Sequence, residues 1–376
     1  MKPRRKPNGD RYWSYLLVYV DDCLLVDHAP DETMTRLKRM YNLKNDTFGE
    51  PDRYLGANVG KYELTNGLHW SMSARDYLKE ACKLVETLST TDGRRWIKTR
   101  KNAMVETYRP ENDVSDLLGD DLSTRYMQLI GILRWGVELG RIDIITEISI
   151  LSSHSCAPRA GHLEAVYQIF EYIQSHLRST VVFDSESIVY STDRFKPVDW
   201  GGIYGEIEEN IPNELPQALG KSVTLTIFVD AAHAGDLVNR RSQTGVIIFI
   251  NSAPITWYSK RQATVEASTF GSEFVALRIG MEMNDGLRYK LRMMGVKIEG
   301  ATNVFCDNQS VVDNSTLPES QLKKKHLSIC YHYVRECCAK KAARIAFEPT
   351  DTNLADLCTK VLSANRRRKL CQSLLY

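Results

Sequence analysis

An apolar run rich in β-branched residues, at positions 224–229, leads directly into Asp230, and this pattern predicts a strand with a carboxylate at its C-terminal end. Three more isolated acids, Glu273, Asp307 and Asp356, follow where a helix start, a strand end and a terminal helix are indicated. Four carboxylates from distant parts of a chain converge only if the fold brings them together, and divalent cations then offset their repulsion. This layout is typical of a nuclease that uses two metal ions.

The residues between the first two acids predict a small sheet followed by a long helix. Segments 244–250 and 254–259 have strand composition and are separated by a turn, so three antiparallel strands are the simplest interpretation. Apolar residues then recur at helical spacing as far as Met294, with Ser268 or Thr269 as the N-cap. Glu273 therefore lies in an early turn of this helix, where it can face Asp230.

The last two acids lie on shorter elements. The pattern predicts a strand, a helix, a strand and a helix at 303–306, 322–341, 344–347 and 353–362. Asp307 follows the first of these strands, and Asp356 lies in the final helix. The order predicts an α/β fold with a mixed sheet and flanking helices.

Seven strings in this half of the chain closely resemble the ribonuclease H domain of copia-type LTR retrotransposons. They are Val229-Asp-Ala-Ala-His-Ala-Gly-Asp236, Arg241-Ser-Gln-Thr-Gly245, Trp257-Tyr-Ser-Lys-Arg-Gln262, Ser272-Glu-Phe-Val-Ala-Leu277, Cys306-Asp-Asn-Gln-Ser310, Lys325-His326 and Leu354-Ala-Asp-Leu-Cys-Thr-Lys360. The resemblance implies a ribonuclease H-like sheet in which Asp230, Glu273, Asp307 and Asp356 are catalytic and bind two Mg²⁺ ions, with Mn²⁺ as an alternative. Such ions activate a water molecule and stabilise the leaving oxygen.

Two positions depart from the pattern of that family. Many relatives carry a further acid where this chain has Ala232, and another where it has Gly271. Neither position belongs to the four acids. An isolated acid is more often a solvated surface residue, and this alternative is strongest for Asp356, which lies near the C-terminus. His326 is interpreted as a capping or packing residue, and for His233, three residues after Asp230, the catalytic and the structural interpretation both stay open. Neither histidine is placed among the catalytic residues.

The front of the chain predicts a hairpin with an acidic tip. Apolar runs at 15–20 and 23–26 are joined by Asp21 and Asp22, which is by itself a common kind of polar turn. The string Tyr19-Val-Asp-Asp22 resembles the palm signature of reverse transcriptases. Further stretches that resemble the palm, thumb and connection of the same family are found at 53–56, 76–79, 126–134 and 161–172.

Polymerase activity is nevertheless not expected. The family's palm uses a third carboxylate from an earlier strand, and its fingers come from a still earlier segment. Only twenty residues precede Asp21, and Asp10 lies in a polar lead-in rather than at the end of an apolar strand. Asp21 and Asp22 are therefore interpreted as a remnant of a polymerase site.

Proline and glycine residues crowd one stretch that has no periodic apolar face, and it predicts a linker. The predicted organisation is a palm remnant, a helical thumb or connection region, the linker, and a ribonuclease H domain with a basic C-terminal tail, at 1–80, 81–190, 191–220 and 221–376. A length of 376 residues fits two or more domains.

A net charge of +2 is too small to indicate a nucleic-acid partner by itself, but basic clusters in the second half are more informative. Lysine and arginine in these clusters can pair with the backbone phosphates of a duplex. The candidates are Arg240, Arg241, Lys260, Arg261, Lys324 and Lys325. Each cluster is also explained by a solvated face, which is the ordinary role of a charge run.

Other compositional features favour a soluble intracellular protein. No apolar run reaches the roughly 18 residues of a membrane span, and no signal peptide is indicated. The nine cysteines show no metal-ligand spacing, so reduced thiols and no zinc site are expected. By resemblance, the protein is expected in the cytoplasm, in a virus-like particle, or in the nucleus, with other Pol segments as additional partners.

The predicted function is Mg²⁺-dependent endonucleolytic cleavage of the RNA strand in an RNA–DNA hybrid, recognised by shape and 2′-hydroxyl contacts. One alternative is a retroelement relic that binds nucleic acid without turnover. Another is a nuclease of the same fold that cuts DNA. Cleavage assays on hybrid and on duplex DNA distinguish the three.

Overall fold

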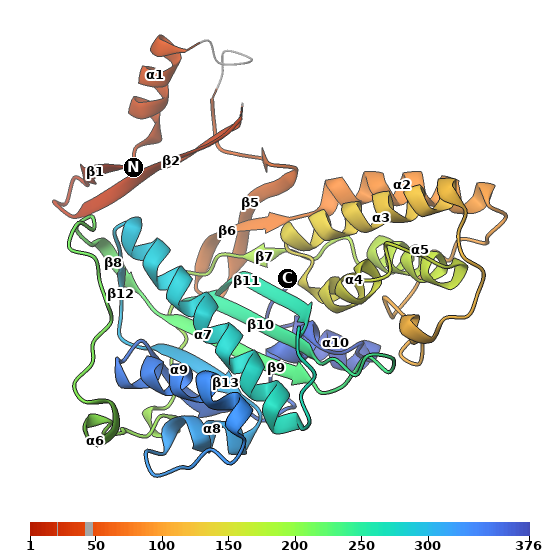
Figure 1. Ribbon diagram of the computed structural model, residues 1–376. Helices are drawn as coiled ribbons and strands as arrows, with labels where there is room; N and C mark the ends of the chain where they lie inside the picture. Colours follow the sequence, from red (N-terminus) through yellow and green to blue (C-terminus); the bar gives the residue numbers. More distant parts are fainter. Residues whose placement is uncertain (21, 42–47) are drawn as a thin grey trace.

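A five-stranded mixed sheet forms the centre of the computed structural model, which describes residues 1–20, 22–41 and 48–376 (Figure 1). Its strands, in spatial order, are β11 Ala253–Arg261, β10 Gln243–Ile250, β9 Leu225–Ala232, β13 Thr302–Cys306 and β14 Ala343–Phe347. The first three are antiparallel, and β13 and β14 run parallel to β9. This is the topology of a ribonuclease H-like sheet, and the predicted fold class is confirmed.

The central strand β9 is buried along almost its whole length, which explains its continuous apolar sequence. Alternate residues of the sheet enter two different cores. Ile227 and Val229 face helix α7, whereas Phe228 faces a second core that also contains the helices of the front region. The sheet is thus covered on both faces.

One face of the sheet is covered by α7 Thr269–Met293, which crosses the strands, with α8 Gln309–Thr316 and α9 Ser328–Ala339 beside it (Figure 1). The Ser268 side chain accepts a hydrogen bond from the amide of Gly271, which confirms Ser268 as the N-cap. A short 3₁₀ turn, η5 Lys325–Leu327, precedes α9.

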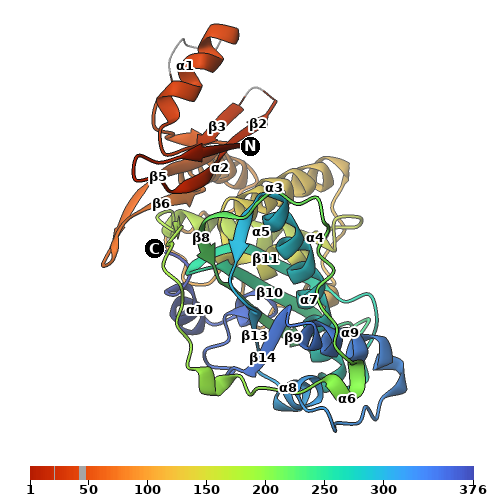
Figure 2. The same cartoon turned by 90° about the vertical axis from the view of Figure 1, so that its left-hand side faces the viewer.

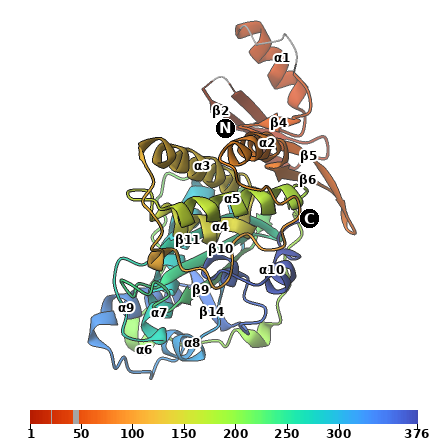
Figure 3. The same ribbon diagram turned by 90° about the vertical axis from the view of Figure 1, so that its right-hand side faces the viewer.

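Within the described residues, the front region contains two small sheets and five helices, and part of it lies beside β11 (Figure 3). The strands are β1 Lys2–Arg5, β2 Arg11–Tyr19, β3 Asp22–Val26, β4 Arg53–Tyr54, β5 Ala57–Leu64, β6 Gly67–Ser73 and β7 Val181–Val182. The helices are α1 Pro30–Met40, α2 Arg75–Thr91, α3 Asp120–Glu138, α4 Ile145–Ser152 and α5 Ala160–Ser175, with 3₁₀ turns at η2 Pro110–Asn112 and η3 Ile142–Ile144. Strands β1–β3 and helix α1 project from the top of the molecule (Figure 2).

The predicted acidic hairpin corresponds to β2 and β3, which pair antiparallel from Tyr15 with Val26 to Tyr19 with Asp22. Asp22 is exposed at the start of β3, and Asp21 lies outside the described residues. The hairpin packs near the C-terminal end of α7, where the Tyr15 hydroxyl donates to the Met294 carbonyl at 2.7 Å.

The stretch from residue 191 to 220 is largely irregular, with short helical turns at η4 Thr192–Arg194 and α6 Gly201–Tyr204. It leads into β8 Leu219–Val223, which pairs parallel with β12 Val296–Ile298. Glu209 anchors the stretch to α7 by ion pairs with Arg288 and Arg292, at 2.8 and 2.5 Å.

The front region and the sheet share one apolar core. Trp257 of β11 donates its indole N–H to the carbonyl of Val137 in α3 at 3.0 Å. Thr146 of α4 donates to the carbonyl of Leu357 at 2.7 Å. Among the described helices, none is long and apolar enough to cross a membrane.

Several local predictions were wrong. Strand β9 continues to Ala232, so Asp230 lies within it, because Ala231 and Ala232 still pair with β10. The helix predicted from residue 322 begins at Ser328, and α8 was missed because its polar sequence has no helical apolar period.

The C-terminal segment also differs from its prediction. Asp356 lies in a 3₁₀ turn, η6 Leu354–Cys358, because this segment packs tightly against Gly245. The basic run is not a free tail: it lies in α10 Ala364–Cys371, where Arg367 is only 3% exposed. Packing against the front region orders this helix.

Candidate metal centre

The four predicted carboxylates converge at one edge of the sheet. Cys306 pairs with Val229 across β13 and β9, so Asp307 follows beside Asp230. Oxygens of Asp230, Asp307 and Asp356 lie within 4.8 Å of one another. Oxygens of Glu273 and Asp307 also lie within 4.8 Å of each other, with the Cys306 sulfur in the same group. The fold therefore assembles all four acids.

Asp356 is held at the sheet by two polar contacts from its own segment. The Asn353 side chain, which is fully buried, donates to the Val229 carbonyl at 2.9 Å. The Thr359 hydroxyl donates to Asp230 Oδ2. These contacts join η6 to β9 on both sides of Asp356.

Burial makes the ionised form of these acids costly. Asp230 is 1% exposed, and Glu273 and Asp356 are each 3% exposed. Burial raises the pKa of Asp230, against the opposing charge of Lys360 and with a further contribution from Asp356 and Asp307. Burial also raises the pKa of Glu273 well above its ordinary value, and the charges of Asp230 and Asp307 add to this. A cation at this site would relieve both effects.

Two oxygens of the cluster indicate that a cation can bind here. Asp230 Oδ1 and Glu273 Oε2 are buried and have no hydrogen-bond partner within the described part of the chain. Buried carboxylate oxygens are normally satisfied, and unsatisfied ones indicate an ion or another missing ligand. Carboxylate oxygens are the ligands that Mg²⁺ prefers. The residues present therefore fit a magnesium ion.

Cys306 is an unexpected neighbour of the acids. Its thiol is fully buried, and burial raises its pKa well above the ordinary value, with a further contribution from Glu273. A protonated thiol is a poor metal ligand, because the thiolate is the form that coordinates metals. Cys306 is therefore better interpreted as a core residue than as a ligand.

Two basic residues that the sequence analysis did not single out enter the cluster. Lys360 Nζ lies 2.6 Å from Asp356 Oδ1 and 3.3 Å from Asp230 Oδ2. Arg366 Nη2 lies 2.8 Å from Asp356 Oδ2. Burial alone would lower the pKa of Lys360, but the charges of Asp230 and Asp356 raise it above its ordinary value. For Lys360 the available signals were its spacing of four residues from Asp356 and its place at the end of one of the seven family-like strings.

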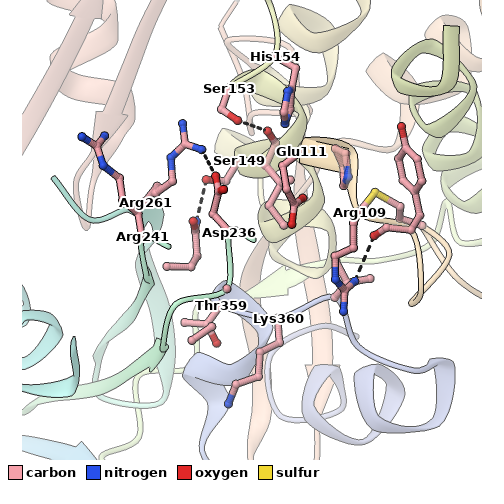
Figure 4. A pocket seen from close by; sticks show the side chains of 18 residues that line it. Arg109, Glu111, Ser149, Ser153, His154, Asp236, Arg241, Arg261, Thr359 and Lys360 are labelled. Carbon is pink, nitrogen blue, oxygen red and sulfur yellow. Dashed lines mark hydrogen bonds and ion pairs between the residues drawn. The ribbon is translucent and has the colours of Figure 1, made fainter. Parts of the chain in front are cut away.

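A cavity of about 210 Å³ adjoins the cluster, between the sheet and the front region (Figure 4). Thr359 and Lys360 belong both to its wall and to the carboxylate cluster. Its cationic wall is contributed by Arg109, Arg241 and Arg261.

The predicted basic residues differ in how close they lie to the carboxylate cluster. Arg241 and Arg261 line the cavity, and Arg261 pairs with Asp236 at 2.5 Å. Lys324 contacts the Ser268 hydroxyl at the start of α7, the helix that carries Glu273. The remaining members, Arg240, Lys260 and Lys325, are exposed.

The other predicted residues lie elsewhere or make structural contacts. Asp22 lies on the β2–β3 hairpin, which contacts the chain through Tyr15 just beyond the C-terminal end of α7. Because α7 is about 37 Å long and carries Glu273 near its other end, Asp22 takes no part in the cluster. His326 Nε2 lies 3.2 Å from Glu266 Oε2, and His233 Nδ1 is buried without a partner among the described residues.

Comparison with known proteins finds relatives of this chain among retroelement proteins. It is 25% identical over 371 residues to the "Retrovirus-related Pol polyprotein from transposon TNT 1-94" of Nicotiana tabacum, covering 96% of this chain and 24% of the relative. It is also 24% identical over 354 residues to the corresponding polyprotein from transposon RE1 of Arabidopsis thaliana. That match covers 93% of this chain and 21% of the relative. The chain is a homologue of retrotransposon Pol polyproteins. The resemblance predicted from the sequence is thereby confirmed.

The retrotransposon homologues differ from this chain in extent. The chain spans about a quarter of the length of the two plant polyproteins. A putative transposon Ty5-1 protein of Saccharomyces cerevisiae is 25% identical over 250 residues, covering 66% of each. No protein-family model matches the chain.

Solved structures similar to this Pol homologue are ribonuclease H domains. One is the N-terminal domain of rv2228c from Mycobacterium tuberculosis, at 15% identity and a TM-score of 0.29, covering 40% of this chain and 99% of that one. Another is LC11-RNase H1 in complex with an RNA/DNA hybrid, at 15% identity and a TM-score of 0.30. That match covers 37% of this chain and 96% of the solved one.

Proposed function

We propose that this chain is a Mg²⁺-dependent endonuclease that cleaves the RNA strand of an RNA–DNA hybrid. The observation that carries the proposal is the pair of unpartnered buried oxygens, Asp230 Oδ1 and Glu273 Oε2, within a cluster of four carboxylates. Unpaired acids at this depth destabilise a protein, so their presence favours a function that uses a cation.

Asp230, Glu273, Asp307 and Asp356 are the residues that would hold Mg²⁺, and Asp307 lies within 4.8 Å of Glu273 on one side and of Asp230 and Asp356 on the other. When bound, such an ion supplies Lewis-acid activation of water and stabilises charge on the phosphate. The protein fixes the positions of the four acids, because each lies on or directly after a different element, β9, β13, α7 or η6. The contacts of Asn353 and Thr359 hold η6 against β9. The resemblance implies that these four acids together would hold two such ions.

A nucleic-acid substrate is supported by charge around the acids. Arg241 lines the adjoining cavity and has no side-chain partner within the described ranges. Arg240, Lys260, Lys324 and Lys325 extend the basic surface. Such groups would pair with phosphates, and selection for a hybrid would come from groove shape and 2′-hydroxyl contacts.

The front region is proposed to support the nuclease rather than to synthesise DNA. Of the polymerase remnant, Asp22 is exposed on a hairpin remote from the carboxylate cluster. The proposed domain boundaries remain 1–80, 81–190, 191–220 and 221–376. Primer extension by the isolated chain would contradict this part of the proposal.

The test is cleavage of an end-labelled RNA–DNA hybrid by the purified chain in Mg²⁺, beside duplex DNA and single-stranded RNA. Asp307→Asn removes a carboxylate from the cluster and is expected to reduce cleavage to background. Asp120→Asn makes the same chemical change at an exposed position in the first turn of α3, and it should cleave like the wild type.

Each outcome has a distinct meaning. Hybrid-specific cleavage that only Asp307→Asn loses supports the proposed function. Cleavage of duplex DNA instead would identify a DNA-cutting nuclease of this fold. Hybrid binding without cleavage by folded protein would identify a binding protein that has lost turnover, and the catalytic assignment would be wrong.

A further inference from the structure

The carboxylate cluster is divided into a paired half and an unpaired half. Both oxygens of Asp356 have cationic partners: Lys360 lies 2.6 Å from Oδ1, and Arg366 lies 2.8 Å from Oδ2. By contrast, Asp230 Oδ1 and Glu273 Oε2 have no partner among the described residues. The two halves therefore differ in their need for a cation.

The Lys360 ammonium occupies the place between two acids where a bridging metal ion would lie. It contacts Asp356 at 2.6 Å and Asp230 at 3.3 Å, both of which are almost fully buried. An ammonium group is compact and donates in three directions, so it can bridge two carboxylates in this way.

Local backbone structure holds Lys360 in this position. Its amide donates to the Asp356 carbonyl at 3.2 Å, which closes a turn between the two residues. The preceding residue, Thr359, is itself bonded to Asp230. The backbone of Lys360 therefore lies beside the acids, so that its side chain can contact both of them.

Arg366 is anchored independently of the cluster. Its Nη1 donates to the Asp351 carbonyl at 2.6 Å and lies 3.3 Å from the Asp351 carboxylate. It extends from the first turn of α10, whose N-cap is Ser363. This second cation compensates Asp356 without blocking Asp230.

The charge balance leaves room for one divalent ion. Four ionised carboxylates carry four negative charges, and Lys360 with Arg366 offsets two of them. The remaining two charges match one divalent cation near Glu273, Asp307 and the free oxygen of Asp230. A second divalent ion would have to displace the Lys360 ammonium from Asp230 and Asp356.

We propose that the nucleic-acid-free protein binds one divalent cation and that the Lys360 ammonium takes the place of a second. The inference rests on the proposed function, because it specifies how the same acids use metal. Lys360 is accordingly a positioning residue that sets the number of bound ions. Removing its charge should open the space between Asp230 and Asp356 to another ion.

The experiment measures bound Mn²⁺ per chain by equilibrium dialysis, without nucleic acid. The wild type is expected to bind one ion. Lys360→Met removes the charge at similar length and is expected to bind two. Lys360→Arg keeps a cation and should bind one, and Lys297→Met, at an exposed lysine of β12, should also leave the value at one.

The outcomes separate this inference from the proposed function. Two ions on the wild type would overturn the inference while the nuclease proposal stands. One ion on folded Lys360→Met would also overturn it. No ion on the wild type would contradict both, and circular dichroism of each variant establishes that it is folded. If Lys360→Met does not fold, Lys360→Gln removes the same charge with a polar side chain, and one ion on folded Lys360→Gln would equally overturn the inference.

Discussion

The guanidinium of Arg367 in α10 donates a hydrogen bond to the carboxylate of Glu147 in α4, and both side chains are almost fully buried. Arg367 also donates to the Asp143 carbonyl at 2.6 Å. The pair joins the C-terminal helix to the front region across more than two hundred residues of sequence. It helps to place η6, the segment just before α10, against the sheet.

Replacing Arg367 with methionine should lower the free energy of unfolding by about 3–5 kcal/mol, because Glu147 would remain buried without its partner. Urea denaturation measures this change. Arg368→Met alters the adjacent, exposed arginine and should change stability by less than about 0.5 kcal/mol. Equal effects of the two variants would show that the buried pair is not important for stability.

Residues 221–376 expressed alone should not unfold cooperatively. Phe228, Phe249 and Phe305 of the sheet belong to the same apolar core as the front helices, and removal of those helices would expose them. Thermal unfolding followed by near-ultraviolet circular dichroism tests this expectation against the full chain. A sharp transition at the temperature of the full chain would mean that the two regions are energetically independent.

Glu209 should stabilise the protein only where its carboxyl group is ionised. Burial alone would raise its pKa, but hydrogen bonds from Arg288 and Arg292 outweigh this and lower the pKa to about 2. A carboxyl whose pKa is lowered on folding stabilises the folded state above the unfolded pKa, and the contribution is lost as pH falls toward the folded value.

The stability difference between the wild type and Glu209→Gln should therefore be constant near neutral pH and shrink from about pH 4.5 downwards. Denaturation at a series of pH values provides the measurement. Glu208→Gln changes the neighbouring acid, for which no ion pair is found within the described residues, and should show no such trend. A difference that does not depend on pH would contradict the ion-pair explanation.

Gly245→Ala should displace the segment that carries Asp356. A Cβ at Gly245 would lie 2.6 Å from a Thr359 methyl carbon and 2.7 Å from the Ala355 carbonyl oxygen. Overpacking of this kind costs about 1–3 kcal/mol, and Mn²⁺ binding should weaken with it.

The matched control for Gly245→Ala is Gly286→Ala, at an exposed site in α7 with no atom within 4 Å of the new carbon. Alanine is the better helix former, so this variant should gain up to about 1 kcal/mol. Calorimetry and Mn²⁺ dialysis on both variants test the pair. Unchanged metal binding by Gly245→Ala would show that η6 tolerates the displacement.

The sequence by itself determined the strands β9, β10 and β11, helix α7 with its Ser268 cap, and the four acids. These features depend on composition and spacing within short segments, which act before any distant contact forms. The resemblance of seven separate strings supplied the expected roles of the acids.

Only the tertiary structure decided how the carboxylates are neutralised. Sequence patterns indicated no partner for Lys360 or Arg366, yet both pair with Asp356, and Lys360 also contacts Asp230, 130 residues away in sequence. The register of β9 against β13 and the packing of α10 against the front region bring these groups together. Coulomb interactions depend on distance in space, which sequence separation does not specify.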